Sequence, residues 1–265
     1  MRALALGSDV IVFVSRVWQT TCTAVRAGDE GFVIDSPVFP DELEALPSVL
    51  EQAGFPASGL LTTHADWDHL LGRLAFPGAS LGCAESTAAR LRSEPGRAQR
   101  ALRQFDEENY VEGRTSLSLA AYQSLPAPGR VGLGPDQELE IHPAEGHTAD
   151  GAAFVLPWLG VLVCGDYLSP VEIPLICEGG SLAAYRATLE HLRELVGRAE
   201  NVVPGHGAPV GRERALELLE QDAAYLDALA REGAQAPLPE GRRTATQRAI
   251  HERNAERVAT TRPRR

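Results

Sequence analysis

A short segment with two histidines and two aspartates constrains this chain more than any other feature. The segment HADWDH, residues 64–69, directly follows the apolar run GLLTT of residues 59–63. Imidazoles and carboxylates both bind divalent metal ions, and they are seldom crowded together without something positive to bind. In an extended segment His64 and Asp66 point to the same side of the chain. We therefore expect a metal-binding loop at the end of a strand.

Three more potential ligands occur at the ends of apolar segments or in tight glycine-containing loops. His147 lies in EGHTADG, Asp166 in VCGDYLSP and His206 in VVPGHGAP. Each is weak evidence alone, because turns rich in glycine often carry a polar residue for structural reasons. Their recurrence at the same kind of position is a poor fit to chance, so we predict that they complete one metal site.

The pattern of apolar residues predicts strands followed by helices, twice along the chain. In the first part it predicts strands at 10–14, 22–26, 31–35 and 59–63, a helical stretch from residue 40 interrupted at Pro47, and a polar helical region at about 85–110. In the second part it predicts short strands near 115–142, a hairpin of buried strands within 152–166, a strand entering the loop at 201–207, and amphipathic helices at 181–195 and 212–232.

Composition and charge narrow the partners. A chain of 265 residues with 44% apolar residues can bury the core of one large domain or two modest ones. Its net charge of −11 argues against a nucleic acid as main partner, so we expect a small-molecule substrate. It contains no lysine, which excludes a lysine nucleophile or Schiff base. It also lacks an apolar run of about 18 residues, so we expect no membrane contact and a cytoplasmic location.

The four cysteines suggest neither a structural metal site nor a disulfide framework. They are scattered and form no C-x-x-C pair, which disfavours a structural zinc site. We interpret them as small buried residues, and the four are Cys22, Cys83, Cys164 and Cys177.

The candidate ligands, in their order and spacing, resemble the five-motif signature of the metallo-β-lactamase superfamily. The matching residues are Asp35 after a strand, the HADWDH loop, His147, Asp166 and His206. The resemblance covers roughly residues 10–232. It implies an α+β fold, an αββα sandwich of two mixed sheets with helices outside and the site along one edge. Asp66 is the only departure, because the family pattern H-x-H-x-D-H has a histidine there.

The resemblance also implies a role for each motif residue. The implied ligands are His64, Asp66 and His147 for a first metal ion, and Asp68, His69 and His206 for a second. Asp166 would bridge the two ions, and Asp35 would brace the loops by hydrogen bonding without touching a metal ion. Asp68 can also orient the attacking water, so Asp68 and Asp166 are the catalytic candidates.

Asp66 changes what the first metal position prefers. With Asp68 and Asp166 it brings the formal charge of the ligand set to −3, against +4 for two divalent ions. A carboxylate is a harder ligand than an imidazole, so manganese or iron competes better with zinc at this position. We expect two divalent metal ions, with zinc as the first expectation. In an alternative, Asp66 is too short to reach the metal and hydrogen-bonds a ligand or water instead.

The expected function is a metal-dependent hydrolase. The resemblance implies a metal-bound hydroxide that attacks a small-molecule ester, thioester, lactone or phosphoester. Two alternatives stay open. The first alternative is a flavodiiron-like or mononuclear-iron oxidoreductase, because an acidic residue at position 66 also resembles the flavodiiron branch of the superfamily. Flavodiiron proteins normally carry a flavodoxin domain, and the residues after 232 are too few to form one. The second is an inactive binding protein with the same fold.

We expect one metallo-β-lactamase-like domain at residues 1–235 and a basic helical tail at 236–265. From residue 238 the tail carries eight arginines and three acidic residues, and we expect it to be solvated or docked rather than bound to nucleic acid. A helical insertion at about 85–112 falls where relatives place a lid over the site. A homodimer is open.

Several residues outside the motifs receive weaker expectations. Candidates for lining a substrate pocket are Arg103, Phe105 and Tyr110 of the insertion, and Tyr167 and Ser169 beside Asp166. We expect Trp67 to pack beneath the metal loop. The histidines that match no motif, expected in surface or structural roles, are His142, His191 and His251.

Overall fold

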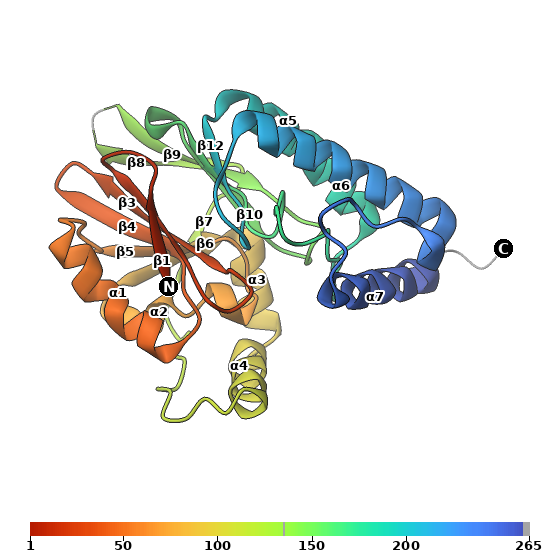
Figure 1. Cartoon of the computed structure of the whole chain (residues 1–265). Helices are drawn as coiled ribbons and strands as arrows, with labels where there is room; N and C mark the ends of the chain where they lie inside the picture. Colours follow the sequence, from red (N-terminus) through yellow and green to blue (C-terminus); the bar gives the residue numbers. More distant parts are fainter. Residues whose placement is uncertain (135, 262–265) are drawn as a thin grey trace.

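The computed structural model describes residues 1–134 and 136–261. Two β-sheets face each other, and helices cover the outer side of each (Figure 1). Both sheets are mixed, with parallel and antiparallel strand pairs. The predicted α+β class and αββα sandwich are therefore confirmed.

The first sheet has seven strands whose spatial order follows the sequence. The strands are β1 (Arg2–Ala5), β2 (Val10–Val14), β3 (Thr21–Ala27), β4 (Glu30–Asp35), β5 (Gly59–Thr62), β6 (Ser80–Ala84) and β7 (Gln123–Leu125). Strands β1 to β4 pair antiparallel, and β4 to β7 pair parallel. The ends of β4 and β5 therefore lie at the same edge, which is the edge where the HADWDH loop begins.

The second sheet has six strands in the order β13-β12-β11-β10-β9-β8. Its strands are β8 (Gly129–Gly134), β9 (Gln137–Pro143), β10 (Ala152–Leu156), β11 (Val161–Val163), β12 (Asn201–Val203) and β13 (Val210–Gly211). Strands β10 and β11 form the predicted hairpin, and β11 pairs parallel with β12. Because β11 and β12 run in the same direction, the residues that follow them meet at one edge.

Seven α-helices and three 3₁₀ helices are present within the described residues. The α-helices are α1 (Pro40–Gln52), α2 (Gly72–Ala75), α3 (Glu85–Ser93), α4 (Arg97–Glu108), α5 (Leu182–Arg198), α6 (Arg212–Glu232) and α7 (Ala245–Thr261). The 3₁₀ helices are η1 (Trp67–His69), η2 (Pro157–Leu159) and η3 (Gly233–Gln235). Helices α1 to α4 lie on the side of the first sheet, and α5 to α7 lie on the side of the second (Figure 1).

Helix α1 runs without a break through Pro47, so the expected interruption there is wrong. Proline inside a helix removes one hydrogen bond and costs about 3 kcal/mol. Here α1 buries Leu43, Leu46 and Leu50 in the core beside the first sheet. Burial of such side chains contributes about 1.5–3 kcal/mol each, which outweighs the cost of the proline.

Buried apolar side chains form three layers. The central layer lies between the sheets and includes Val12 of β2 and Phe154 of β10. A second layer joins the first sheet to its helices and includes Leu46, and a third joins the second sheet to α5 and α6 and includes Leu189. Each sheet is thus buried on both faces, which leaves the loops at the sheet edges to build a site.

The helical insertion and the tail both contribute to these cores. Helix α4 buries Ala98, Leu102 and Phe105 in the layer beside the first sheet. Helix α7 packs against α6 and adds Ile250 to the third layer. The tail is therefore docked in its described part, while its last arginines, Arg262, Arg264 and Arg265, lie outside the described residues.

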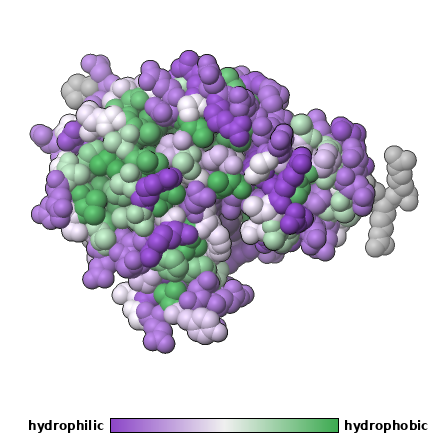
Figure 2. Space-filling model, in the orientation of Figure 1, coloured by the Kyte–Doolittle hydropathy of each residue, from purple (hydrophilic) through white to green (hydrophobic). Residues whose placement is uncertain are grey.

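The surface of the face seen in Figure 2 is uneven. Apolar side chains gather on its left, where Figure 1 shows strands of both sheets, and hydrophilic side chains cover α5. An apolar cleft of about 200 Å³, lined by Leu61, Val131 and Leu133 among others, opens between the sheets. None of the helices in the described part of the chain combines the length and the apolar character that crossing a bilayer requires.

Candidate metal centre

The predicted ligands converge at one edge of the sandwich. His64 follows β5 and Asp166 follows β11, while His206 follows β12 and His147 lies in the loop between β9 and β10. Backbone hydrogen bonds join the two halves at this edge, from Thr21 N to Gly205 O (2.8 Å) and from Ala152 N to Thr63 O (2.8 Å). The structure thus brings together all seven residues that the sequence nominates as ligands.

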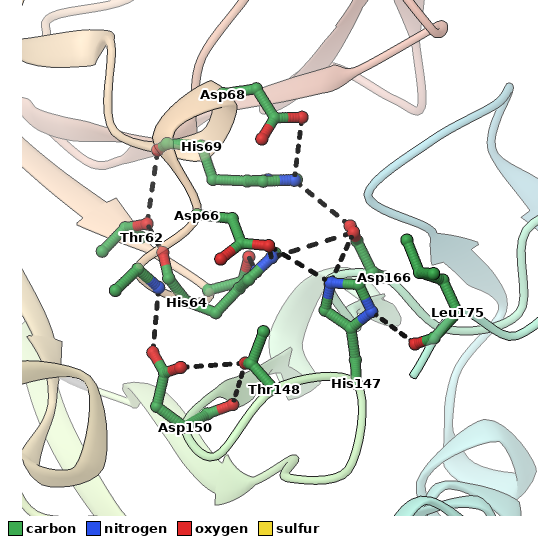
Figure 3. Close-up of polar contacts among 12 residues, drawn as sticks. Thr62, His64, Asp66, Asp68, His69, His147, Thr148, Asp150, Asp166 and Leu175 are labelled. Carbon is green, nitrogen blue, oxygen red and sulfur yellow. Dashed lines mark hydrogen bonds and ion pairs between the residues drawn. The ribbon is translucent and has the colours of Figure 1, made fainter. Parts of the chain in front are cut away.

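Six of the seven side chains form two groups, and all six except His206 are labelled in Figure 3. The first group is His64, Asp66 and His147, and the second is Asp68, His69 and His206; within each, one ligand atom per residue lies within 4.8 Å of the others. Asp66 Oδ2 is 3.8 Å from His64 Nε2 and 3.5 Å from His147 Nε2. Asp68 Oδ2 is 3.6 Å from His69 Nε2 and 3.7 Å from His206 Nε2.

Asp166 lies between the two groups and turns one oxygen to each. Its Oδ2 is 3.2 Å from His147 Nε2 and 3.8 Å from His64 Nε2. Its Oδ1 is 3.2 Å from His69 Nε2 and 3.3 Å from His206 Nε2. This carboxylate can therefore contact one cation in each group at the same time.

Each of the four imidazoles is held through its Nδ1 atom. The contacts of Nδ1 are His64 to Thr63 Oγ1 (3.1 Å), His69 to Asp35 Oδ2 (3.0 Å), His147 to Leu175 O (2.8 Å) and His206 to Trp18 O (3.2 Å). Carbonyl and carboxylate oxygens only accept, and the Thr63 hydroxyl already donates to Asp35, so Nδ1 of these rings must carry the hydrogen. In the neutral form of each ring, Nε2 then has a lone pair that points into the site, and this is the tautomer that binds a metal ion.

Several of the inward-pointing atoms lack a partner. Within residues 1–134 and 136–261, the buried atoms of this site without a hydrogen bond are His64 Nε2, His69 Nε2, His147 Nε2 and Asp166 Oδ1. Unpaired buried polar atoms are rare because each costs desolvation free energy. Four of them around one centre, three imidazole nitrogens and a carboxylate oxygen, fit a site for divalent cations.

The electrostatics of the site show the same demand for positive charge. Burial alone would raise the pKa of Asp166, but the imidazoles of His206 and His69 hold it well below its usual value. Burial would lower the pKa of His206, but Asp166 and Glu172 raise it to about 9. In the metal-free chain, protons on the imidazoles therefore supply part of the positive charge that bound cations would supply.

Asp35 ties the metal loop to the end of β4. Its Oδ1 accepts from Thr63 N (2.8 Å), and its Oδ2 accepts from Thr63 Oγ1 (2.9 Å) and contacts His69 Nδ1. Asp35 has a φ of 58°, in the left-handed region where aspartate and asparagine are the commonest residues besides glycine. The strained backbone places its carboxylate beneath the loop and out of the ligand groups.

Three polar residues near the site were not found from the sequence. Arg90 of α3 contacts Asp66, and the buried Asp150 contacts Arg90 and the backbone of Ala65. Glu172 is near the second group, where burial raises the pKa of its carboxyl and Asp166 raises it further, while His206 lowers it. Asp150 stands three residues after His147, which was an available signal, but Arg90 sits in a polar helix without a motif.

The hydroxyl groups beside Asp166 serve the protein itself. Tyr167 Oη donates to Ala144 O (3.2 Å) and accepts from His147 N (3.0 Å). Ser169 Oγ donates to His206 O (2.7 Å). Both residues are buried, so they orient the ligand loops in this structure.

The aromatic residues near the metal loop form a cluster. Trp67 packs against Phe105 with ring centroids 4.8 Å apart and against Trp18 with centroids 5.7 Å apart. The three rings border a cavity of about 500 Å³. The other two insertion residues differ, because Arg103 and Tyr110 are exposed to solvent.

The histidines and cysteines outside the motifs belong to neither ligand group, although Cys177 lies beside His147 and donates its backbone N–H to His147 O (2.7 Å). His142 and His191 contact each other through ring nitrogens (3.1 Å), and His251 contacts Tyr225 Oη (3.0 Å). All four cysteines are free thiols; Cys177 is partly exposed, unlike the other three, which are buried.

The comparisons with known proteins agree with this geometry. A family model described as the metallo-β-lactamase superfamily matches residues 15–206. This chain belongs to the metallo-β-lactamase superfamily. No curated protein sequence matches it.

Solved structures of the superfamily share the fold. A metallo-β-lactamase family protein from Thermus thermophilus is 21% identical, with a TM-score of 0.68 over 97% of this chain and 95% of that chain. A metallo-β-lactamase from Pontibacter korlensis is 20% identical, with a TM-score of 0.58 over 83% and 98%. A stereoselective inverting sec-alkylsulfatase from Pseudomonas sp. is 13% identical, with a TM-score of 0.70 over 97% of this chain and 49% of that chain.

Identities this low establish the shared architecture and not the substrate. Superfamily membership and the His/Asp groups together support a metal-dependent hydrolase in general.

Proposed function

We propose that this chain is a hydrolase with two divalent metal ions that acts on a small-molecule ester, thioester, lactone or phosphoester. The observation that carries the proposal is the position of Asp166, which turns one oxygen to each of two His/Asp groups. The first ion would be held by His64, Asp66 and His147, and the second by Asp68, His69 and His206, with Asp166 shared.

Divalent ions in such a site make water nucleophilic near neutral pH and polarise a carbonyl or phosphoryl oxygen. The chain itself supplies position and proton handling. Asp68 directs Oδ2 at both imidazoles of the second group, so its other oxygen is left to accept a hydrogen bond from the attacking water. Asp166 and Asp68 would be the catalytic carboxylates, and Asp35 keeps His69 aligned.

The surroundings support a small substrate. One cavity of about 500 Å³ borders Trp67 of the metal loop, and another of about 410 Å³ borders Ala65 and Arg90. Pockets for small molecules have volumes of about 300–1,000 Å³. The net charge of −11 disfavours a nucleic acid substrate.

The donor atoms bear on the choice of metal. The second group offers two imidazoles and one carboxylate, and so does the first group because of Asp66. We propose that zinc is the ion in both positions. Manganese and iron compete better here than at a group of three imidazoles, since oxygen ligands favour harder ions.

The proposal is tested with a substrate panel and a matched pair of histidine variants. Wild-type protein loaded with zinc or manganese is assayed on esters, thioesters, lactones and phosphoesters, beside His206→Ala and the control His191→Ala. His206 lies in the second group, whereas His191 contacts His142, which belongs to neither group. We expect loss of at least about 100-fold in turnover for His206→Ala and little change for His191→Ala.

Two results would refute the hydrolase. One is unchanged turnover and metal content in His206→Ala. The other is wild-type protein that carries iron and consumes dioxygen without hydrolysing any member of the panel, which would establish the oxidoreductase alternative.

A further inference from the structure

Arg90 reaches from helix α3 to the edge of the first group. Its side chain is only 9% exposed, although it carries a full positive charge. Its guanidinium contacts three carboxylates, those of Asp66 (2.7 Å), Asp150 (2.8 Å) and Glu94 (3.2 Å). A buried arginine of this kind is retained only with well-placed partners, because desolvation of the charge is costly.

The contact divides the two oxygens of Asp66. Oδ1 accepts from Arg90 NH2 at 2.7 Å, and Oδ2 is the oxygen that faces His147 Nε2 and His64 Nε2. The guanidinium therefore prevents Asp66 from turning both oxygens inward or swinging out to solvent.

Asp150 fixes the guanidinium from the opposite side. Its Oδ1 accepts from Arg90 NH1 (2.8 Å) and Thr148 Oγ1 (2.8 Å), and its Oδ2 accepts from Ala65 N (2.9 Å). Ala65 stands between His64 and Asp66, and Thr148 follows His147. Asp150 thus connects Arg90 to both loops that supply the first group, and Figure 3 shows its contact with Thr148.

We propose that Arg90 is the positioning residue that makes Asp66 a one-oxygen ligand of the first metal ion. The side chain of aspartate is shorter than that of histidine, so it serves in this place only when its carboxylate is held in one orientation. Arg90 supplies that orientation and offsets the additional negative charge that Asp66 brings beside Asp166. The inference rests on the proposed metal centre.

The first test compares metal affinity in two arginine variants. Arg90→Gln removes the contact to Asp66, whereas the control Arg97→Gln removes an arginine of α4 that contacts Glu94 and Glu178. Metal-free protein is titrated with Co²⁺ or Zn²⁺ against a chelator. We expect one of the two ions to bind about 10–100-fold more weakly in Arg90→Gln, with the other unchanged and Arg97→Gln like wild type.

The second test asks whether Arg90 acts through Asp66. In the Asp66→His background the imidazole needs no guanidinium, so adding Arg90→Gln is expected to change the affinity for either ion less than about 3-fold. Arg90→Lys keeps the charge, but a lysine cannot hydrogen-bond to Asp66 and Asp150 at the same time as the two arms of a guanidinium do. In the wild-type background we therefore expect it to weaken the binding of the same ion. Circular dichroism of each variant reports folding.

The outcomes separate this inference from the proposed function. Two ions bound by wild type and by Arg90→Gln with equal affinity would overturn the role of Arg90 and leave the metal centre intact. An equal loss in the Asp66→His background would also overturn it, since Arg90 would then support the fold alone. A wild-type chain that takes up no metal ion would refute the proposed function, and this inference with it.

Discussion

The ring nitrogen Nδ1 of His147 lies 2.8 Å from the carbonyl oxygen of Leu175. This contact fixes which nitrogen of His147 faces the first group. Leu175 is itself held from the tail, because the side chain of Asn254 on α7 accepts from Ile176 N (2.8 Å) and donates to Pro174 O (2.6 Å). A residue 107 positions after His147 therefore sets the peptide that orients it.

Asn254→Leu should reduce both stability and metal affinity. The variant leaves two buried backbone groups without their partners, at a cost of about 1–3 kcal/mol each. Urea unfolding of the metal-free chain should show a loss of about 2–6 kcal/mol, and chelator competition should show weaker binding of one ion. Arg253→Ala, on the exposed side of α7, is the control. Unchanged stability in Asn254→Leu would contradict this reading of the tail.

Asp35→Asn should weaken the binding of the second metal ion without unfolding the loop. Asparagine tolerates the positive φ of this position, but its amide removes the charge that holds His69 Nδ1. We expect affinity for one ion to fall by about 10–100-fold in metal titrations. Asp29→Asn, in the exposed turn before β4, should titrate as wild type does. An equal effect in both variants would speak against a bracing role for Asp35.

Metal uptake should release protons and strengthen with pH. The pKa of His206 is raised to about 9 in the metal-free chain, so its imidazole is protonated below that pH and must lose the proton before it binds a metal ion. Apparent affinity should therefore rise between about pH 6 and pH 9, by at most about tenfold per pH unit for each proton displaced. Calorimetry in buffers of different ionisation enthalpy counts these protons. Uptake without proton release would contradict the prediction.

Glu42 should stabilise the fold in a pH-dependent way. Burial would raise its pKa, but hydrogen bonds from Ser15 Oγ (2.6 Å) and Arg16 N (3.0 Å) contribute to lowering it from 4.5 to about 2. A depressed carboxyl pKa adds stability above the unfolded value of 4.5, and this stability is lost as the pH falls toward 2.

Glu42→Gln is the variant that tests this linkage. At pH 7 it should lower the free energy of unfolding by about 3 kcal/mol, which is the order of magnitude that the shift implies. Urea unfolding should show the difference from wild type shrinking as the pH is lowered from about 5 to about 3. A difference that stays constant over this range would show that Glu42 acts through packing alone.

Most of the fold follows from local patterns in the sequence. Strands β2 to β5 and the hairpin of β10 and β11 follow short apolar runs bounded by turn residues, and helices α5 and α6 follow helical periodicity. Local propensity predicts a break of α1 at Pro47, because it does not include the burial of leucines on the sheet. Tertiary packing decided this element.

The ligand groups were predictable for a different reason. His64, Asp166 and His206 lie two or three positions after the ends of strands, so strand ends that meet at one edge bring them together. Contacts such as Arg90 to Asp66 and Asn254 to Pro174 join residues 24 and 80 positions apart. These contacts depend on how α3 and α7 pack, and neither helix carries a sequence motif that predicts such contacts.

The metal content of protein purified without added metal tests the central claim most directly. Elemental analysis should find about two divalent ions per chain, zinc or manganese, and both should be lost in Asp166→Asn because this carboxylate faces both groups. A wild-type chain without bound metal that also fails to take up zinc or manganese in titration would contradict the account.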